Sequence, residues 1–308
     1  MLYVVKKQNI WYILQDNIRI KLSTWLLAKY LIHFIKRLQN KTKKEMLIIE
    51  KEFLWLMLIE GFNYKLYKEF IKVFSNVSNI YEVSKDIKLF QSKIYSNHIL
   101  IPNYIYSKIV SQELKNKTDV IYSNLLKQNI SIVTINSNKY PKKLFNTYNP
   151  PFVIFEYGKV LSNINDKKII YLYDENLSKF GKKVYKYFNY YIKDKMLKIG
   201  SDDDNDILVR YENILNEKYI NTQEKSRIII AKENSRLEVI LGLSDYLLII
   251  EAMYNSDTKN MVESVMEQGK EILVVPGNIF NKNHYFSNYL IQEGATVLLN
   301  KRDLDKFL

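Results

Sequence analysis

The chain has 308 residues, 47% hydrophobic and 26% charged, a composition typical of globular proteins that excludes disordered and collagen-like classes. It has no cysteine and three widely separated histidines, which excludes disulfides, thiolate metal sites and a cysteine nucleophile. The net charge of +13 is uneven: residues 1–150 hold 24 basic and 10 acidic side chains, and residues 151–308 hold 22 and 23. This asymmetry favours a nucleic acid or an acidic membrane surface as partner, although an AT-rich genome also enriches lysine.

Residues 1–44 are expected to form a basic N-terminal extension. A short mixed segment is followed by Ser23–Leu38, where apolar residues recur at helical spacing beside a cluster of lysines and arginines. Three roles are open for this segment: a helix on a membrane surface, an arm that binds nucleic acid, or a helix packed on the next domain. The sequence does not distinguish between these roles. Its apolar run Trp25–Ile35 is interrupted by Lys29 and is too short to span a bilayer, so we expect no membrane span and a cytoplasmic protein.

Residues 45–125 are expected to form a small all-helical domain. Two stretches with helical periodicity, 45–58 and 63–74, flank Gly61, and a third follows at 81–90.

Residues 126–308 show a different pattern, in which short apolar runs alternate with helical stretches. We expect strands at 130–135, 152–155, 168–173, 246–252, 271–275 and 296–299, and helices at 178–195, 256–268 and 286–293. Buried strands separated by helices predict a doubly wound, mostly parallel α/β sheet.

A series of short motifs in the last third carries a resemblance to a known family. In chain order these are Leu241-Gly242-Leu243-Ser244-Asp245, Ile250-Glu251-Ala252, Glu267-Gln268-Gly269-Lys270, Val274-Val275-Pro276-Gly277, Asn288-Tyr289-Leu290-Ile291 and Gly294-Ala295. Their order and spacing resemble the DNA-processing protein A family, also called DprA or Smf. The resemblance covers about residues 45–300 and implies a Rossmann-like domain preceded by a small helical domain.

The resemblance implies a cytoplasmic, non-enzymatic protein that binds single-stranded DNA. It implies delivery of the DNA to a recombinase of the RecA type, a role in natural transformation and DNA recombination, and a homodimer. No cofactor or metal is expected. The residues expected to contact the nucleic acid are Gly181, Lys182, Lys183, Arg236, Ser256, Thr258, Gly277 and Asn288.

Three places depart from the family's pattern. Tyr173-Asp174-Glu175 stands where the family has a Gly-Ser-Arg type of turn, Ile199-Gly200-Ser201-Asp202 is a remnant of its second motif, and Arg236-Leu237-Glu238 keeps only the first arginine of an Arg-Asn-Arg triplet. A bulky ring and two carboxylates do not suit a turn that cradles phosphate. The stretch between Gly200 and Arg236 is also short, so one strand–helix unit is expected to be missing.

Several of these residues have purely structural interpretations. Ser256 is expected to cap its helix, Gly277 to turn the chain, Asn288 to hold the adjoining loop, and most rings of 181–195 to lie in the core. His284 has no visible catalytic partner, and the acidic run 202–206 lacks the spacing of a calcium loop.

Two alternative functions remain open. Glu251 ends a predicted strand at the sheet edge where ligands bind, so the chain is alternatively a nucleotide-binding hydrolase or transferase that uses this carboxylate. The other alternative is a degenerate dimeric adaptor that has lost DNA binding.

Overall fold

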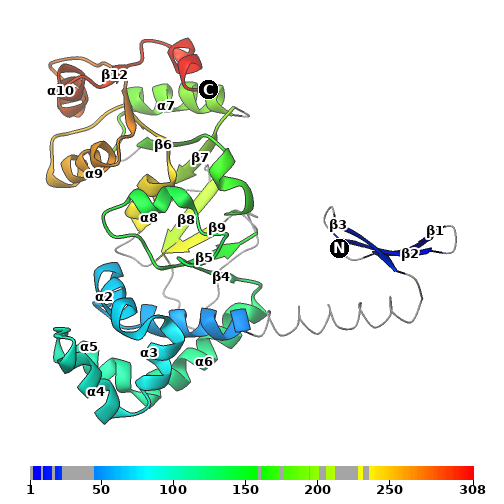
Figure 1. Cartoon of the computed structure of the whole chain (residues 1–308). Helices are drawn as coiled ribbons and strands as arrows, with labels where there is room; N and C mark the ends of the chain where they lie inside the picture. Colours follow the sequence, from blue (N-terminus) through cyan, green and yellow to red (C-terminus); the bar gives the residue numbers. More distant parts are fainter. Residues whose placement is uncertain are drawn as a thin grey trace. The chain divides into compact units, whose positions relative to one another are not determined.

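The computed structural model describes residues 3–7, 10–15, 18–22, 45–158, 161–173, 176–193, 195–200, 206–211, 228–231 and 236–308 (Figure 1). The chain forms two compact units, Met1–Glu52 and Phe53–Leu308.

The described residues of the first unit include a small antiparallel sheet with the strand order β1-β2-β3. The strands are β1 (Tyr3–Lys7), β2 (Ile10–Gln15) and β3 (Ile18–Leu22). Sequence analysis predicted only a short mixed segment here, although the apolar–basic alternation of β3 is the pattern of a half-buried strand. The helix predicted at Ser23–Leu38 lies outside the described residues.

The predicted helical segment starts with helical residues 45–57, of which 45–52 belong to the first unit and 53–57 to the second. The second unit continues with α2 (Tyr64–Phe74), α3 (Val77–Val83), α4 (Ile87–Ser96), α5 (Asn103–Val110) and α6 (Gln112–Lys127). The stretch predicted as one helix at 81–90 is divided between α3 and α4, because the Asp86 side chain accepts a hydrogen bond from the Leu89 N–H and begins a new helix.

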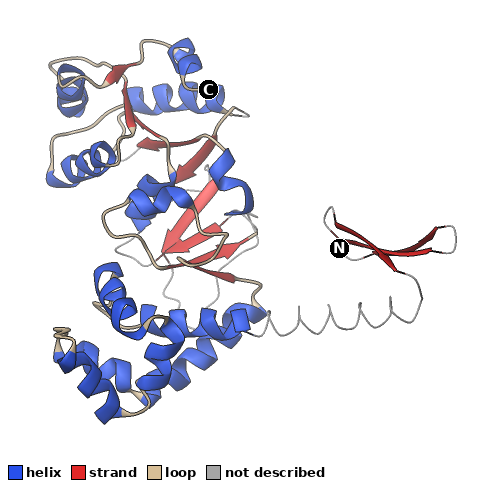
Figure 2. Ribbon diagram, in the orientation of Figure 1, coloured by secondary structure: helices blue, strands red, loops and turns tan. Residues whose placement is uncertain are grey.

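Nine strands of the described residues form the main sheet, in the order β12-β11-β10-β6-β7-β8-β9-β5-β4. Pairing is parallel from β12 to β9 and antiparallel for β9–β5 and β5–β4, which confirms the doubly wound, mostly parallel α/β fold (Figure 2). The strands are β4 (Ser131–Thr134), β5 (Val153–Tyr157), β6 (Ile169–Tyr173), β7 (Leu197–Gly200), β8 (Ile207–Tyr211), β9 (Ile228–Ala231), β10 (Tyr246–Ile249), β11 (Glu271–Val274) and β12 (Thr296–Val297).

The region between Gly200 and Arg236 holds two strands that the sequence did not indicate. It contains β8 and β9, which were not predicted and which join β7 to β5 in the sheet. This stretch therefore contributes two strands to the sheet, and the expectation that one strand–helix unit of the family is missing stays a prediction.

Helices α7 (Lys179–Ile192), α8 (Arg236–Leu243), α9 (Ser256–Glu267) and α10 (Tyr285–Gln292) connect or follow the parallel strands. All five residues of β6 are buried, and because successive side chains point to opposite faces, both faces of this strand are covered. On one face Ile170 and Leu172 pack with Phe188 and Ile192 of α7. Tyr187 was expected in this core because of its helical spacing, but its ring is exposed.

Short 3-10 helices complete the unit: η1 (Lys142–Asn146), η2 (Leu161–Asp166), η4 (Lys282–His284) and η5 (Lys301–Lys306). The helical segment lies beyond β4 at one end of the sheet (Figure 1). Tyr67 of α2 stacks on Phe152, with ring centroids 5.7 Å apart, and the Tyr64 N–H donates to Asn149 Oδ1 at 3.2 Å. The boundary at residue 125 stays a prediction.

Lys270, directly before β11, binds the C-terminal end of α8. Its Nζ donates to the carbonyl oxygens of Leu241 at 2.5 Å and Gly242 at 2.8 Å, a position that suits a cation at the negative end of a helix. Burial lowers the pKa of Lys270 to about 8.

This shift predicts a pH-dependent stability. Between pH 8 and the ordinary lysine pKa, the unfolded chain holds a proton that folded Lys270 has released, so the free energy of unfolding rises with pH. We expect a rise of about 1–2 kcal/mol from pH 8 to 9.5, which Lys270→Met abolishes. Urea unfolding at the two pH values measures it. Lys259→Met, at an exposed lysine, is the control, and an unchanged pH dependence in Lys270→Met would contradict the assignment.

Candidate nucleic-acid interface

The candidate site lies where the strand order of the parallel sheet reverses, between β6 and β10. The sheet continues from β6 through β7 to β9 on one side and from β10 through β11 to β12 on the other. Tyr173, the last residue of β6, pairs with Ile249, the last residue of β10. In doubly wound sheets ligands bind beyond the carboxyl ends of the strands at such a switch point, so the residues that follow these strands form the candidate site.

A buried carboxylate occupies the head of α7. Glu251, 2% exposed, accepts hydrogen bonds from the Ser178 N–H at Oε2 and from the Ser178 hydroxyl at Oε1, each at 2.7 Å. Ser178 is the N-cap of α7, and its Oγ also accepts from the Gly181 N–H at 3.1 Å. A negative charge is stabilised at a helix N-terminus, which is also where a phosphate binds. The protein's own carboxylate therefore takes the place of an anion here.

Gly181 makes this approach possible. A Cβ at this position would lie 2.6 Å from the carboxyl carbon of Glu251, closer than side chains tolerate. Gly181 was predicted to let a nucleic-acid phosphate approach, but in the structure the group against it is Glu251.

Gly277 permits a similarly close approach by the side chain of His284. The His284 ring is buried, a Cβ on Gly277 would overlap it, and its Nε2 lies 3.4 Å from Glu251 Oε1. Among the described residues its Nδ1 has no hydrogen-bond partner. The sequence showed no side chain that would pair with His284, whereas in the structure Glu251 lies beside it. Gly181, Gly277, Glu251 and His284 thus form one packed cluster.

Asn288 holds the loop that contains Gly277. Its Oδ1 accepts from the Gly277 N–H and its Nδ2 donates to the Gly277 carbonyl oxygen, both at 3.0 Å. Because both polar ends of the amide are used by the loop backbone, Asn288 acts as a support for the loop, one of the two roles that the sequence left open.

At the head of α9 the N-cap is Asn255 and not Ser256, which is the first residue of the helix. Asn255 Oδ1 accepts from the Thr258 N–H at 2.8 Å and from the Thr258 hydroxyl at 2.6 Å. Thr258 is 2% exposed, so its hydroxyl belongs to the cap and does not face a ligand.

The predicted cations lie on the surface. Lys182 and Lys183 are exposed in the first turn of α7. Arg236, also exposed, is the first residue of α8, and since α8 leads into β10 its first residue points toward the carboxyl edge. The neighbouring Glu238 accepts from the Asn149 N–H at 2.8 Å, and burial raises the pKa of Glu238.

Sequence analysis missed a group of exposed rings at this edge, which we call the carboxyl-edge surface. Phe180 lies 6.1 Å from the His284 ring and Tyr254 lies 5.2 Å from Phe286, measured between centroids, so the rings adjoin the buried cluster. No periodic pattern marks them, because they come from separate loops and helix ends. The members are Phe180, Tyr254, Phe280, Tyr285 and Tyr289.

Little space is left beyond the carboxyl ends of β6 and β10. A hollow between Tyr173, Glu251 and Asn255 has room for about one water molecule. Tyr173 replaces the glycine that a phosphate-cradling turn needs, while Asp174, Glu175 and residues 201–205 lie outside the described residues. Asp206 is described, and its Oδ2 accepts from the Lys198 N–H at 2.8 Å. The described residues contain no cluster of side chains suited to a metal ion.

Comparison with known proteins shows similarity to one family. Residues 207–308 match the family model described as DNA recombination-mediator protein A, a span that includes the motifs at 241–295. The DNA processing protein DprA of Bacillus subtilis (strain 168) is 22% identical over 237 residues, which cover 64% of this chain and 80% of that protein. Both comparisons agree with the resemblance to the DNA-processing protein A family, so the predicted recognition is confirmed.

One solved structure shares the fold of this chain. The X-ray structure of DNA processing protein A from Streptococcus pneumoniae aligns with a TM-score of 0.51 and 16% identity, over 74% of this chain and 95% of that chain. DNA processing protein A from Helicobacter pylori, whose structure describes a single-stranded DNA binding mode, aligns with a TM-score of 0.45 and 14% identity, over 58% and 94%. None of the described helices of this chain is long and apolar enough to cross a membrane.

Proposed function

We propose that this DNA-processing protein binds single-stranded DNA, with the carboxyl-edge surface as a principal contact. The observation that carries the proposal is the exposure of five aromatic rings at the sheet edge where this fold binds ligands, one of which, Phe180, lies on α7 with the exposed Lys182 and Lys183. Exposed rings stack on unpaired bases, each stack contributing about 1–3 kcal/mol, and lysines bind the phosphates between them. Duplex DNA hides its base faces, so this combination favours single strands.

The charge distribution indicates a second source of phosphate contacts. Residues 1–44 hold ten basic and one acidic side chain, whereas residues 151–308 are close to neutral. Glu251 also offsets the positive end of α7. The carboxyl-edge surface therefore has modest positive charge, and we propose that the basic extension supplies a large share of the electrostatic attraction.

The proposed role of Glu251 is structural. Both of its oxygens accept hydrogen bonds from Ser178, and the adjacent hollow is too small for a nucleotide. These contacts favour a non-enzymatic function over the alternative of a hydrolase or transferase that uses Glu251.

We further propose that the protein acts in the cytoplasm as a homodimer and delivers single-stranded DNA to a recombinase of the RecA type during DNA uptake. This proposal follows from the family and from the single-stranded DNA preference argued above. The alternative, a dimeric adaptor that has lost DNA binding, predicts no affinity for DNA.

Fluorescence anisotropy of a labelled single-stranded oligonucleotide across a salt series tests the proposal. If about four phosphates are bound, the slope of log affinity against log salt is roughly −3, because each phosphate contributes about 0.7. We expect Lys182→Gln/Lys183→Gln to reduce this slope by about 1.4. Deletion of residues 1–44 is expected to reduce it further.

Lys186→Gln/Lys193→Gln removes the same charge farther along α7 and is the matched control. A preference for the duplex competitor would contradict binding at the head of α7. Equal slopes of log affinity against log salt in the two double variants would also contradict it. Absence of binding at low salt would support the adaptor instead.

A further inference from the structure

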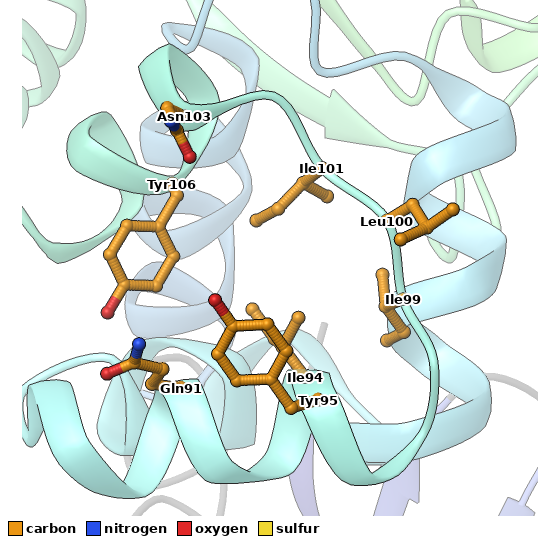
Figure 3. A pocket seen from close by; sticks show the side chains of 8 residues that line it. All are labelled: Gln91, Ile94, Tyr95, Ile99, Leu100, Ile101, Asn103 and Tyr106. Carbon is orange, nitrogen blue, oxygen red and sulfur yellow. The ribbon is translucent and has the colours of Figure 1, made fainter.

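A second hollow lies in the helical segment, far along the chain from the carboxyl-edge surface. It has a volume of about 190 Å³ and lies between α4, α5 and the loop that joins them (Figure 3). Ile94 and Ile99, both buried, contribute apolar walls. Two tyrosines, Tyr95 from α4 and Tyr106 from α5, bring their rings to the same hollow.

The hollow is fixed by local backbone geometry. α4 ends where His98 adopts a left-handed conformation with φ 53°, and the Ile99 N–H then donates to the Ile94 carbonyl oxygen at 3.1 Å. This turn directs residues 99–101 back along the hollow. Tyr106 packs against the fully buried Phe90, with ring centroids 5.9 Å apart, which holds its ring in place.

Several polar groups lie on one side of the hollow. Figure 3 shows the polar ends of Gln91, Tyr95 and Tyr106 on one side of the hollow, with Ile99 and Leu100 on the other. Gln91 and Asn103 both line the hollow and are both exposed, so their amide groups are accessible to a ligand. Tyr95 is 70% exposed, an unusual position for a ring with so much apolar surface.

We propose that this hollow binds one unpaired base of single-stranded nucleic acid. Recognition of single strands relies on stacking against aromatic rings and on hydrogen bonds to the base edge. Tyr95 and Tyr106 offer ring faces, and Gln91 and Asn103 offer amide donors and acceptors for the edge. The inference rests on the proposed function and adds a second contact point on the same strand.

Size and charge favour a base over a protein segment. The hollow is smaller than the ~300 Å³ at which drug-sized pockets begin, and it suits one planar ring system. A groove for an amphipathic helix needs several apolar anchor sites in a row. Lys88 precedes Gln91 and Tyr95 by three and seven positions on α4, so the three share one helix face. Lys88 is exposed and has no ion pair among the described residues, and it is placed to bind the phosphate of the bound nucleotide.

The test is single-stranded DNA binding by the full-length chain, measured by anisotropy with an oligothymidine probe. Tyr95→Ala is expected to weaken binding about 5- to 150-fold without changing the salt slope, since it removes a stack and no charge. Tyr95→Phe retains the ring and is expected to bind within about twofold of the unmodified chain. Lys88→Gln is expected to reduce the salt slope by about 0.7. Tyr148→Ala, at a tyrosine that is 95% exposed and outside the hollow, is the matched control.

A second readout locates the base directly. An oligonucleotide carrying 5-iododeoxyuridine forms photoadducts with aromatic side chains stacked on it, and peptide mapping is expected to find Tyr95 or Tyr106. Normal binding by Tyr95→Ala with adducts confined to the carboxyl-edge surface would overturn the inference and leave the proposed function standing. No binding of any single strand by the unmodified chain would overturn both.

Discussion

Gly277→Ala is expected to lower the free energy of unfolding by about 2–4 kcal/mol. The new methyl group would overlap the buried ring of His284, which is held between this loop and Glu251. Either the ring moves, which breaks its contact with Glu251, or the loop moves, which breaks the two hydrogen bonds to Asn288. Urea denaturation of the full chain, followed by circular dichroism, measures the change.

Two variants separate this steric effect from the general cost of replacing glycine. Gly269→Ala introduces a side chain at φ +65° with open space around it, so only backbone strain of about 1 kcal/mol is expected. In Gly277→Ala/His284→Ala the ring is removed, and we expect a stability close to that of His284→Ala alone. If Gly277→Ala costs no more than Gly269→Ala, the ring does not pack on the loop as described.

Glu251→Gln is expected to destabilise the protein by about 2–4 kcal/mol. The carboxylate accepts hydrogen bonds from the Ser178 N–H and hydroxyl, and it lies at the positive end of α7. Glutamine removes the charge and turns an NH₂ group toward one of these donors, which leaves buried polar groups unpaired. Thermal and urea unfolding both report the loss.

The matched control is Glu263→Gln, which removes an exposed carboxylate 3.6 Å from Lys259 and is expected to change stability by less than about 0.5 kcal/mol. The experiment also decides between a structural and a catalytic Glu251. Catalytic groups are commonly held at some expense of stability, so their replacement is neutral or stabilising. A stable Glu251→Gln that has lost hydrolysis of nucleotides would reverse the proposed role.

The sheet was largely predictable from sequence because its central strands are continuous apolar runs. Ile169–Tyr173, Tyr246–Ile249 and Glu271–Val274 are bounded by turn residues and separated by helices, which identifies buried parallel strands. β8 and β9 are also short apolar runs, ILVRY and IIIA, but no predicted helix separates them in the way that marks the central strands. Their strand character depends on pairing with β7 and β5, which sequence spacing does not reveal.

The contacts of the candidate site were not predicted from sequence. Gly181 and Gly277 were expected to contact the nucleic acid, which stays a prediction, and in the structure each permits the close approach of a side chain because it has no Cβ. The groups that approach them, Glu251 and His284, were not predicted as their partners. Ser178 and Glu251 are 73 positions apart, and only the parallel pairing of β6 with β10 brings them together.

The sequence by itself determined the fold class, the family and the concentration of positive charge in the first half, since these depend on composition, local periodicity and motif order. Tertiary structure decided which groups occupy the sheet edge, because side chains from distant segments compete for the same helix terminus. At α7 the buried carboxylate of Glu251 takes that position. The same holds for the hollow beside Tyr95, whose walls come from two helices and from the turn at His98.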